Sequence, residues 1–146
     1  MSKQDRALFI FFTVAIVAAA GCIGYIAATP KEGEKFTEFY ILGIEGKALG
    51  YPKQAFVGEP VDIVIGVVNH EYQPARYRVK VTIDGIENNE VNVGTLAHEE
   101  KWEEKIGFTP KVTGEKQMVN FYLYKNGEDR PYFKDPLRLH IDVISP

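Results

Sequence analysis

The sequence predicts an all-β domain, a seven-stranded antiparallel β-sandwich, preceded by one N-terminal transmembrane helix. The first observation behind this prediction is an uncharged run of 22 residues from Ala7 to Ala28. The second is that apolar and polar side chains alternate in short segments after residue 35, as in β-strands with one buried face. The third is that turn residues separate these segments at intervals of roughly ten residues, the strand spacing of a sandwich.

The apolar run is long enough to cross a bilayer, because about 20 apolar residues in a helix span its hydrocarbon core. Lys3 and Arg6 precede the run, and positively charged flanks stay in the cytoplasm. This orientation places the C-terminal domain outside the cell. The chain then divides into a cytoplasmic N-terminus (1–6), a transmembrane helix (7–28), a short linker (29–35) and an extracytoplasmic domain (36–146).

A cleaved signal segment is the alternative interpretation of the same run. Ala19-Ala20-Gly21-Cys22 is similar to a lipoprotein cleavage box, in which Cys22 would carry the lipid. We favour the uncleaved helix because the apolar run continues from Ile23 to Ala28, where a lipidated protein normally has a polar tether. Both interpretations hold the domain at the same face of a membrane.

Small residues form a stripe along the predicted helix. Ala20, Gly24 and Ala28 recur at intervals of four, and Gly21 lies beside them. Such spacing lets two helix backbones approach closely in lipid. We expect a helix-contact face there, for a second copy of the chain or for a protein partner in the same membrane. The alternative is that the stripe faces lipid.

The strand pattern is clearest in residues 76–83, where Arg76, Arg78 and Lys80 alternate with apolar residues and Asp84-Gly85 follows as a turn signal. Residues 43–60 are expected to form a long connection. The predicted strands cover residues 36–42, 61–68, 76–83, 91–96, 102–108, 117–125 and 137–143.

Seven such strands predict an immunoglobulin-like sandwich. Its stability must come from apolar packing, because the only cysteine is Cys22 and no disulfide is possible. Residues 31–146 carry 15 basic and 19 acidic residues. This acidic balance argues against nucleic acid as a partner. If the strands alternate in direction, the loops at 69–75, 97–100 and 126–131 meet at the membrane-proximal end.

The composition argues against an enzyme. Ser2 and Ser145 are the only serines, so no nucleophilic triad can be built in the domain. His70 and His98 are expected in loops at one end, near several glutamates, where imidazole and carboxylate could hold a divalent metal. Their spacing matches no ligand motif, and solvated loop residues are the simpler interpretation. We therefore predict no cofactor.

Aromatic residues are a better indication of function. Tyr122 and Tyr124 lie on one side of their predicted strand, opposite Val119, Phe121 and Leu123. The second group supplies a core, so the two tyrosines face a second packed layer or form an exposed interaction strip.

Six segments together are typical of a known family: residues 36–43, 46–48, 51–52, 57–59, 66–72 and 100–103. They resemble the soluble domain of an archaeal membrane protein family of unknown function, number 1616, and more loosely the adhesion-type sandwich domains of prokaryotic cell surfaces. The resemblance implies an archaeal source and an extracytoplasmic domain, and it implies no activity.

These observations together predict a non-catalytic, membrane-anchored binding or assembly module, an accessory subunit of a membrane or cell-envelope complex. The linker 29–35 reaches about 25 Å at most when extended, which favours a protein partner in or on the same membrane. The alternative is a surface domain that binds a small ligand or a metal ion.

Overall fold

The computed structural model describes residues 4, 6 and 33–146. The predicted transmembrane helix, its contact face at Ala20, Gly21, Gly24 and Ala28, and Cys22 lie outside these residues. Within the described part of the chain, no helix is both long enough and apolar enough to cross a membrane. Residues 34–146 form one compact unit.

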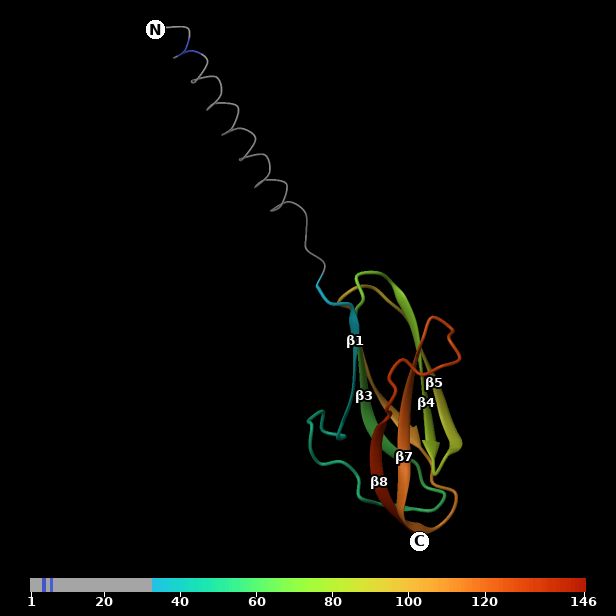
Figure 1. The fold of residues 1–146 in the computed structure, drawn as a ribbon. Helices are drawn as coiled ribbons and strands as arrows, with labels where there is room; N and C mark the ends of the chain where they lie inside the picture. Colours follow the sequence, from blue (N-terminus) through green and yellow to red (C-terminus); the bar gives the residue numbers. More distant parts are fainter. Residues whose placement is uncertain (1–3, 5, 7–32) are drawn as a thin grey trace. The chain divides into compact units, whose positions relative to one another are not determined.

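This unit is built from eight strands in two sheets (Figure 1). The three-stranded sheet has the order β1-β3-β6, and the five-stranded sheet has the order β2-β8-β7-β4-β5. The strands are β1 (Phe36–Leu42), β2 (Gln54–Phe56), β3 (Val61–His70), β4 (Ala75–Ile83), β5 (Ile86–Leu96), β6 (Lys101–Phe108), β7 (Gly114–Lys125) and β8 (Leu137–Ile144).

The prediction of seven antiparallel strands is wrong in one respect. The connection 43–60 contains the short strand β2, which pairs in parallel with β8 through Gln54 opposite Asp142. Only Ala55 of β2 is buried. Three residues are too few to show an alternating pattern, so the sequence does not indicate this strand. It forms because β8 offers a free edge with which it can pair.

Strand β5 is also longer than predicted, because it begins at Ile86 directly after the turn at Asp84-Gly85. Both turn residues have positive φ angles, 49° and 82°, as a tight hairpin turn requires. The turn itself is as predicted. The polar start of β5 resembles a loop in sequence, but it pairs with the end of β4.

The core lies between the sheets, where the predicted alternation holds. Tyr77, Val79, Val81 and Ile83 of β4 are all buried. Ile63, Ile65 and Val67 of β3 face them from the other sheet and are completely buried. Burying apolar side chains in this way stabilises the fold by about 25 cal/mol for each Å² removed from water.

The loops gather at two ends, as alternating strand directions require. Tyr72 and His98 stack with ring centroids 4.2 Å apart, and the backbone N–H of Thr37 donates to the Tyr132 hydroxyl. The β3–β4 and β5–β6 loops therefore meet at one end, and the segment after β7 lies at the start of β1. The C-terminus lies at the opposite end (Figure 1).

Candidate functional site

The outer face of the five-stranded sheet is unusually rich in basic and aromatic side chains. Because successive side chains alternate across a strand, the residues of β4 that do not face the core face outward: Arg76, Arg78 and Lys80. On the neighbouring strand β7, Tyr124 lies opposite Arg78 and Tyr122 lies opposite Lys80. The predicted pair of tyrosines is thus on the outer face, within a row of cations.

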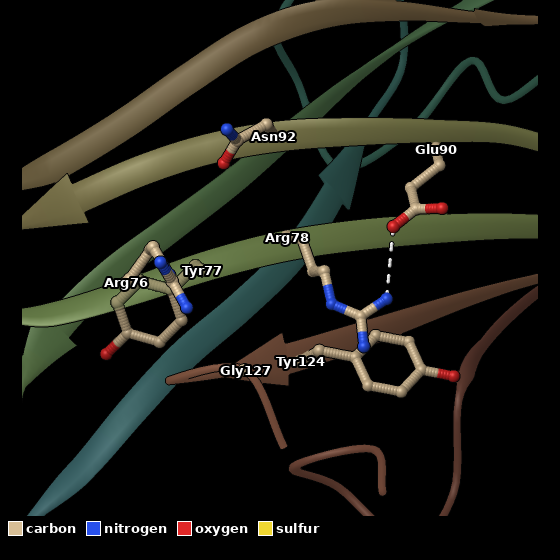
Figure 2. Close-up of a pocket in the computed structure, with 7 residues that line it drawn as sticks. All are labelled: Arg76, Tyr77, Arg78, Glu90, Asn92, Tyr124 and Gly127. Carbon is tan, nitrogen blue, oxygen red and sulfur yellow. Dashed lines mark hydrogen bonds and ion pairs between the residues drawn. The ribbon is translucent and has the colours of Figure 1, made fainter. Parts of the chain in front are cut away.

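Arg78 is the best-fixed side chain of this face. Its guanidinium lies 4.1 Å from the centroid of the Tyr124 ring, a cation–π contact. Nη1 lies 3.0 Å from the Glu90 carboxylate on β5, and Nη2 donates to the backbone carbonyl of Glu128 at 3.2 Å. Figure 2 shows Arg78 between the Tyr124 ring and Glu90. Three contacts in three directions leave this guanidinium little rotational freedom.

Tyr124 is correspondingly covered. It is only 8% exposed, although it points away from the core, because Arg78 and Lys80 lie over its ring. Tyr122 is half-buried. On β4, Arg76 is exposed whereas Arg78 and Lys80 are partly buried, and the function of the two tyrosines as an interaction strip stays a prediction.

Beside Arg78 the surface is hollowed into a groove of about 490 Å³. Figure 2 shows its lining residues, which are Arg76, Tyr77, Arg78, Glu90, Asn92, Tyr124 and Gly127. The volume lies within the range of about 300–1,000 Å³ that is common for ligand pockets. We call this hollow the arginine groove.

Arg76 differs from its neighbour. It is exposed, and its guanidinium forms no ion pair with any residue in the described part of the chain. A Cβ atom added at Gly127 would lie 3.0 Å from Nη2 of Arg76, so the guanidinium lies directly against the glycine. Gly127 follows Asn126 in a turn in which both φ angles are positive, a conformation that Asn and Gly tolerate. The turn therefore places a side-chain-free surface beside the arginine.

A second polar cluster is buried at the end of the sandwich where β1 begins. Glu71 is 5% exposed, and its Oε1 lies 2.9 Å from Lys125 Nζ. Its Oε2 accepts hydrogen bonds from the hydroxyls of Thr37 and Tyr132 at 3.3 and 3.2 Å. The Tyr77 hydroxyl lies 2.7 Å from that of Thr37 and continues the chain of bonds.

This cluster is structural rather than reactive. Both oxygens of Glu71 are occupied, and the Lys125 ammonium balances the buried charge. Burial, together with the Glu71 carboxylate, raises the pKa of Tyr132, and burial is also the main cause that raises the pKa of Tyr77. Both phenols therefore stay protonated at neutral pH. Tyr132 donates directly to the carboxylate. Tyr77 forms a hydrogen bond with the Thr37 hydroxyl, which in turn donates to Glu71. Glu71, one of the glutamates near His70, is buried, so it is not the solvated loop residue that the simpler interpretation of this region expects.

The two histidines considered as metal ligands have different partners. His70 is the last residue of β3 rather than a loop residue, and its ring stacks on Phe36 with Nε2 3.4 Å from Glu38. His98 accepts a hydrogen bond at Nδ1 from the backbone N–H of Tyr72. Among the described residues, no three His, Cys, Asp or Glu side chains are placed to hold a metal ion together.

Sequence reasoning missed both the arginine groove and the Glu71 cluster. The alternation of Arg76, Arg78 and Lys80 was visible, but the partners come from β5 and from the turn after β7. The sequence gives one indication about Tyr124. Phe121 and Leu123 mark the apolar side of β7, and a turn follows the strand, so Tyr124 lies on the other side and close to that turn.

The two-sheet fold defines the class of this protein as a β-sandwich domain of the immunoglobulin-like type. The model of one protein family, the domain of unknown function DUF1616, matches residues 30–143, a range that includes most of the sandwich. The chain belongs to this family.

Two solved structures share the fold. The chain is similar to the crystal structure of the CARDB domain of the PF1109 protein from Pyrococcus furiosus in complex with di-metal ions. The identity is 17%, the TM-score is 0.53, and the match covers 81% of this chain and 100% of that one. The solution structure of the same CARDB domain matches with 16% identity and a TM-score of 0.50, over 76% of this chain and 98% of that one. At this identity the likeness concerns the fold alone. No curated protein matches the sequence.

Proposed function

We propose that this protein is a membrane-anchored, extracytoplasmic binding or assembly module, an accessory subunit of a membrane or cell-envelope complex, and that it has no catalytic activity. Its binding surface is the outer face of the five-stranded sheet, centred on the arginine groove. The uncharged run from Ala7 to Ala28 and the preceding Lys3 and Arg6 support the anchor and its orientation.

The observation that carries the proposal is the exposed, unpaired Arg76 beside the fixed Arg78. The Arg76 guanidinium lies against a turn glycine, is exposed and has no counter-charge among the described residues, so it is available to a partner. Arginine and tyrosine are enriched in protein–protein interfaces, and arginine is frequent among the residues that dominate binding energy. The groove therefore combines the residue types of an interface with an exposed charge that has no ion-pair partner among the described residues.

The chemistry of the domain supports a role without catalysis. The domain has no cysteine, and its only serine is Ser145, next to the C-terminal residue. In the groove, the carboxylate of Glu90 is held by Arg78, so it is not positioned as a free base.

Anchoring also limits where a partner can lie. If the run from Ala7 to Ala28 spans the membrane, the linker 29–35 keeps Phe36 within about 25 Å of the bilayer. A partner in or on the same membrane is then within reach of both the predicted helix face and the groove, and binding at two sites raises the effective concentration.

The experiment that tests this proposal is affinity purification of the full-length protein from native membranes in mild detergent, followed by mass spectrometry. We expect the protein in the carbonate-resistant membrane fraction, together with a stoichiometric protein partner that is reduced by Gly24→Leu. Recovery in the soluble fraction, or recovery without any stoichiometric partner, would contradict the proposed function.

A further inference from the structure

We propose that the arginine groove binds a carboxylate side chain presented by an extended acidic segment of a partner protein. This inference rests on the proposed function and adds the chemical class of the ligand. Its basis is that some hydrogen-bond donors and acceptors of the groove have no partner among the described residues.

The donors of the groove match a carboxylate. The Arg76 guanidinium is planar and has five N–H groups, and a guanidinium binds a carboxylate through two parallel hydrogen bonds. Asn92 adds a further donor, because its Oδ1 accepts from the backbone N–H of Gly94 and its Nδ2 has no partner among residues 33–146. Arg78 is held in place by Glu90 and the Tyr124 ring, so its charge contributes without being reoriented on binding.

A single negative charge suits this groove better than a multiply charged anion. Glu90 lines the same hollow, and its carboxylate would repel a phosphate or a sulfated polymer more strongly than a monovalent group. The domain as a whole is acidic, with 15 basic against 19 acidic residues in 31–146. The net charge of the domain therefore disfavours a long polyanion, whereas a single acidic side chain needs only the local cations Arg76 and Arg78.

The remaining groups of the groove suit a peptide. Only one Glu90 oxygen is needed for the ion pair with Arg78, so the other can accept a backbone N–H from the ligand. Gly127 lines the same hollow and carries no side chain, so it adds no bulk beside Arg76. An extended segment with one glutamate or aspartate would satisfy Arg76 and Glu90 at once.

The test uses the full-length protein in nanodiscs of phosphatidylcholine, which adds no net lipid charge. The probe is a capped, fluorescein-labelled glutamate-rich peptide, and its binding is measured by fluorescence anisotropy. The comparison probes are the same peptide with glutamine in place of glutamate, and heparin. The variant is Arg76→Gln, and the matched control is Lys105→Gln, an exposed cation on β6 in the other sheet. Neither side chain contributes to the core.

We expect the glutamate peptide to bind and the glutamine peptide not to bind. Arg76→Gln should weaken binding about tenfold, the usual effect of losing a charged hydrogen bond, while Lys105→Gln changes it little. Equal weakening by the two substitutions would overturn the proposal, since it would mean that general charge attraction is responsible. Binding of heparin in place of the peptide, or no peptide binding, would also overturn it.

Failure of this inference can be told apart from failure of the proposed function. A partner that co-purifies from native membranes with the Arg76→Gln protein as well as with the wild type leaves the assembly role intact and removes the carboxylate site. Peptide binding that depends on Arg76 without any co-purifying partner leaves the site intact and removes the assembly role.

Discussion

The Tyr40 ring packs over Gly66, and its hydroxyl donates a hydrogen bond to the Glu103 carboxylate. The tyrosine belongs to β1, the glycine to β3 and the glutamate to β6, so one side chain spans the whole three-stranded sheet on its outer face. The donor and acceptor oxygens are 2.5 Å apart. Burial raises the pKa of Tyr40, and the hydrogen bond from Tyr40 lowers that of Glu103, so the donor stays protonated and the acceptor ionised.

This arrangement predicts that Gly66→Ala destabilises the fold. A Cβ atom at this position would overlap the Tyr40 ring, and displacing the ring breaks the bond to Glu103. We expect the free energy of unfolding to fall by about 1–3 kcal/mol, the usual cost of overpacking. Urea denaturation of the full-length protein in detergent measures it. Gly107→Ala is the control, because its Cβ would meet the end of the Asp62 side chain at 3.1 Å and the Val61 carbonyl oxygen at an ordinary 3.8 Å; equal losses would contradict the account.

Breaking the buried ion pair between Glu71 and Lys125 should cost more. Lys125→Met leaves the Glu71 carboxylate buried without a counter-charge, and we expect a loss of about 3–5 kcal/mol. Adding Glu71→Gln to Lys125→Met should recover part of that loss, because it removes the unpaired charge. The same denaturation experiment measures Lys125→Met, Glu71→Gln and the double variant. Additive losses in the double variant would show that the two side chains are not coupled.

Alkaline pH should weaken the same end of the sandwich. Tyr77 and Tyr132 have raised pKa values in the folded protein, so they bind their protons more tightly folded than unfolded. Their contribution is complete below the unfolded tyrosine pKa of about 10 and is lost as the pH rises above it. Denaturation at increasing alkaline pH should show this fall, and Tyr132→Phe should reduce its slope. An unchanged slope would contradict the assignment.

Gly127→Ala should affect both the turn and the groove. The residue has a φ angle of 72°, which costs about 1–2 kcal/mol for a residue with a Cβ atom. The new methyl group would also lie 3.0 Å from Arg76 Nη2 and displace the guanidinium. We expect a modest loss of stability together with weaker binding of the glutamate peptide. Stability loss with unchanged peptide binding would show that the position of Arg76 does not matter.

The alternative metal-binding role makes a separate prediction. Since His70 and His98 have different partners, we expect zinc to leave the melting temperature of the full-length protein unchanged. Thermal unfolding with zinc and with a chelator measures this. A zinc-dependent rise in melting temperature that disappears in the His70→Ala, His98→Ala double variant would favour the metal-binding role.

The strands with regular alternation could be predicted from the sequence, and those without it could not. Residues 76–83 alternate at every step, and they form β4 with one residue added at the start. Gln54–Phe56 has a single buried side chain, so no pattern marks β2 before β8 is placed beside it. The sequence also indicates both tight turns, at Asp84-Gly85 and Asn126-Gly127, because their residue types tolerate positive φ.

The candidate site depends on contacts between distant residues. Arg78 reaches Glu128 across 50 residues, and Glu71 reaches Tyr132 across 61. Such pairs depend on the register between β4 and β7, and no local pattern fixes that register. The sequence did place Tyr124 on the outer face, but it could not indicate that Arg78 covers it.

The central claim is that the arginine groove holds a partner protein. Its most direct test is co-purification from native membranes with Arg76→Glu, compared with Lys105→Glu, which makes the same charge change on the other sheet. We expect the stoichiometric partner of the wild-type protein to be lost with Arg76→Glu and kept with Lys105→Glu, while both variants unfold at the wild-type temperature. Retention of the partner by the Arg76→Glu protein would contradict the claim.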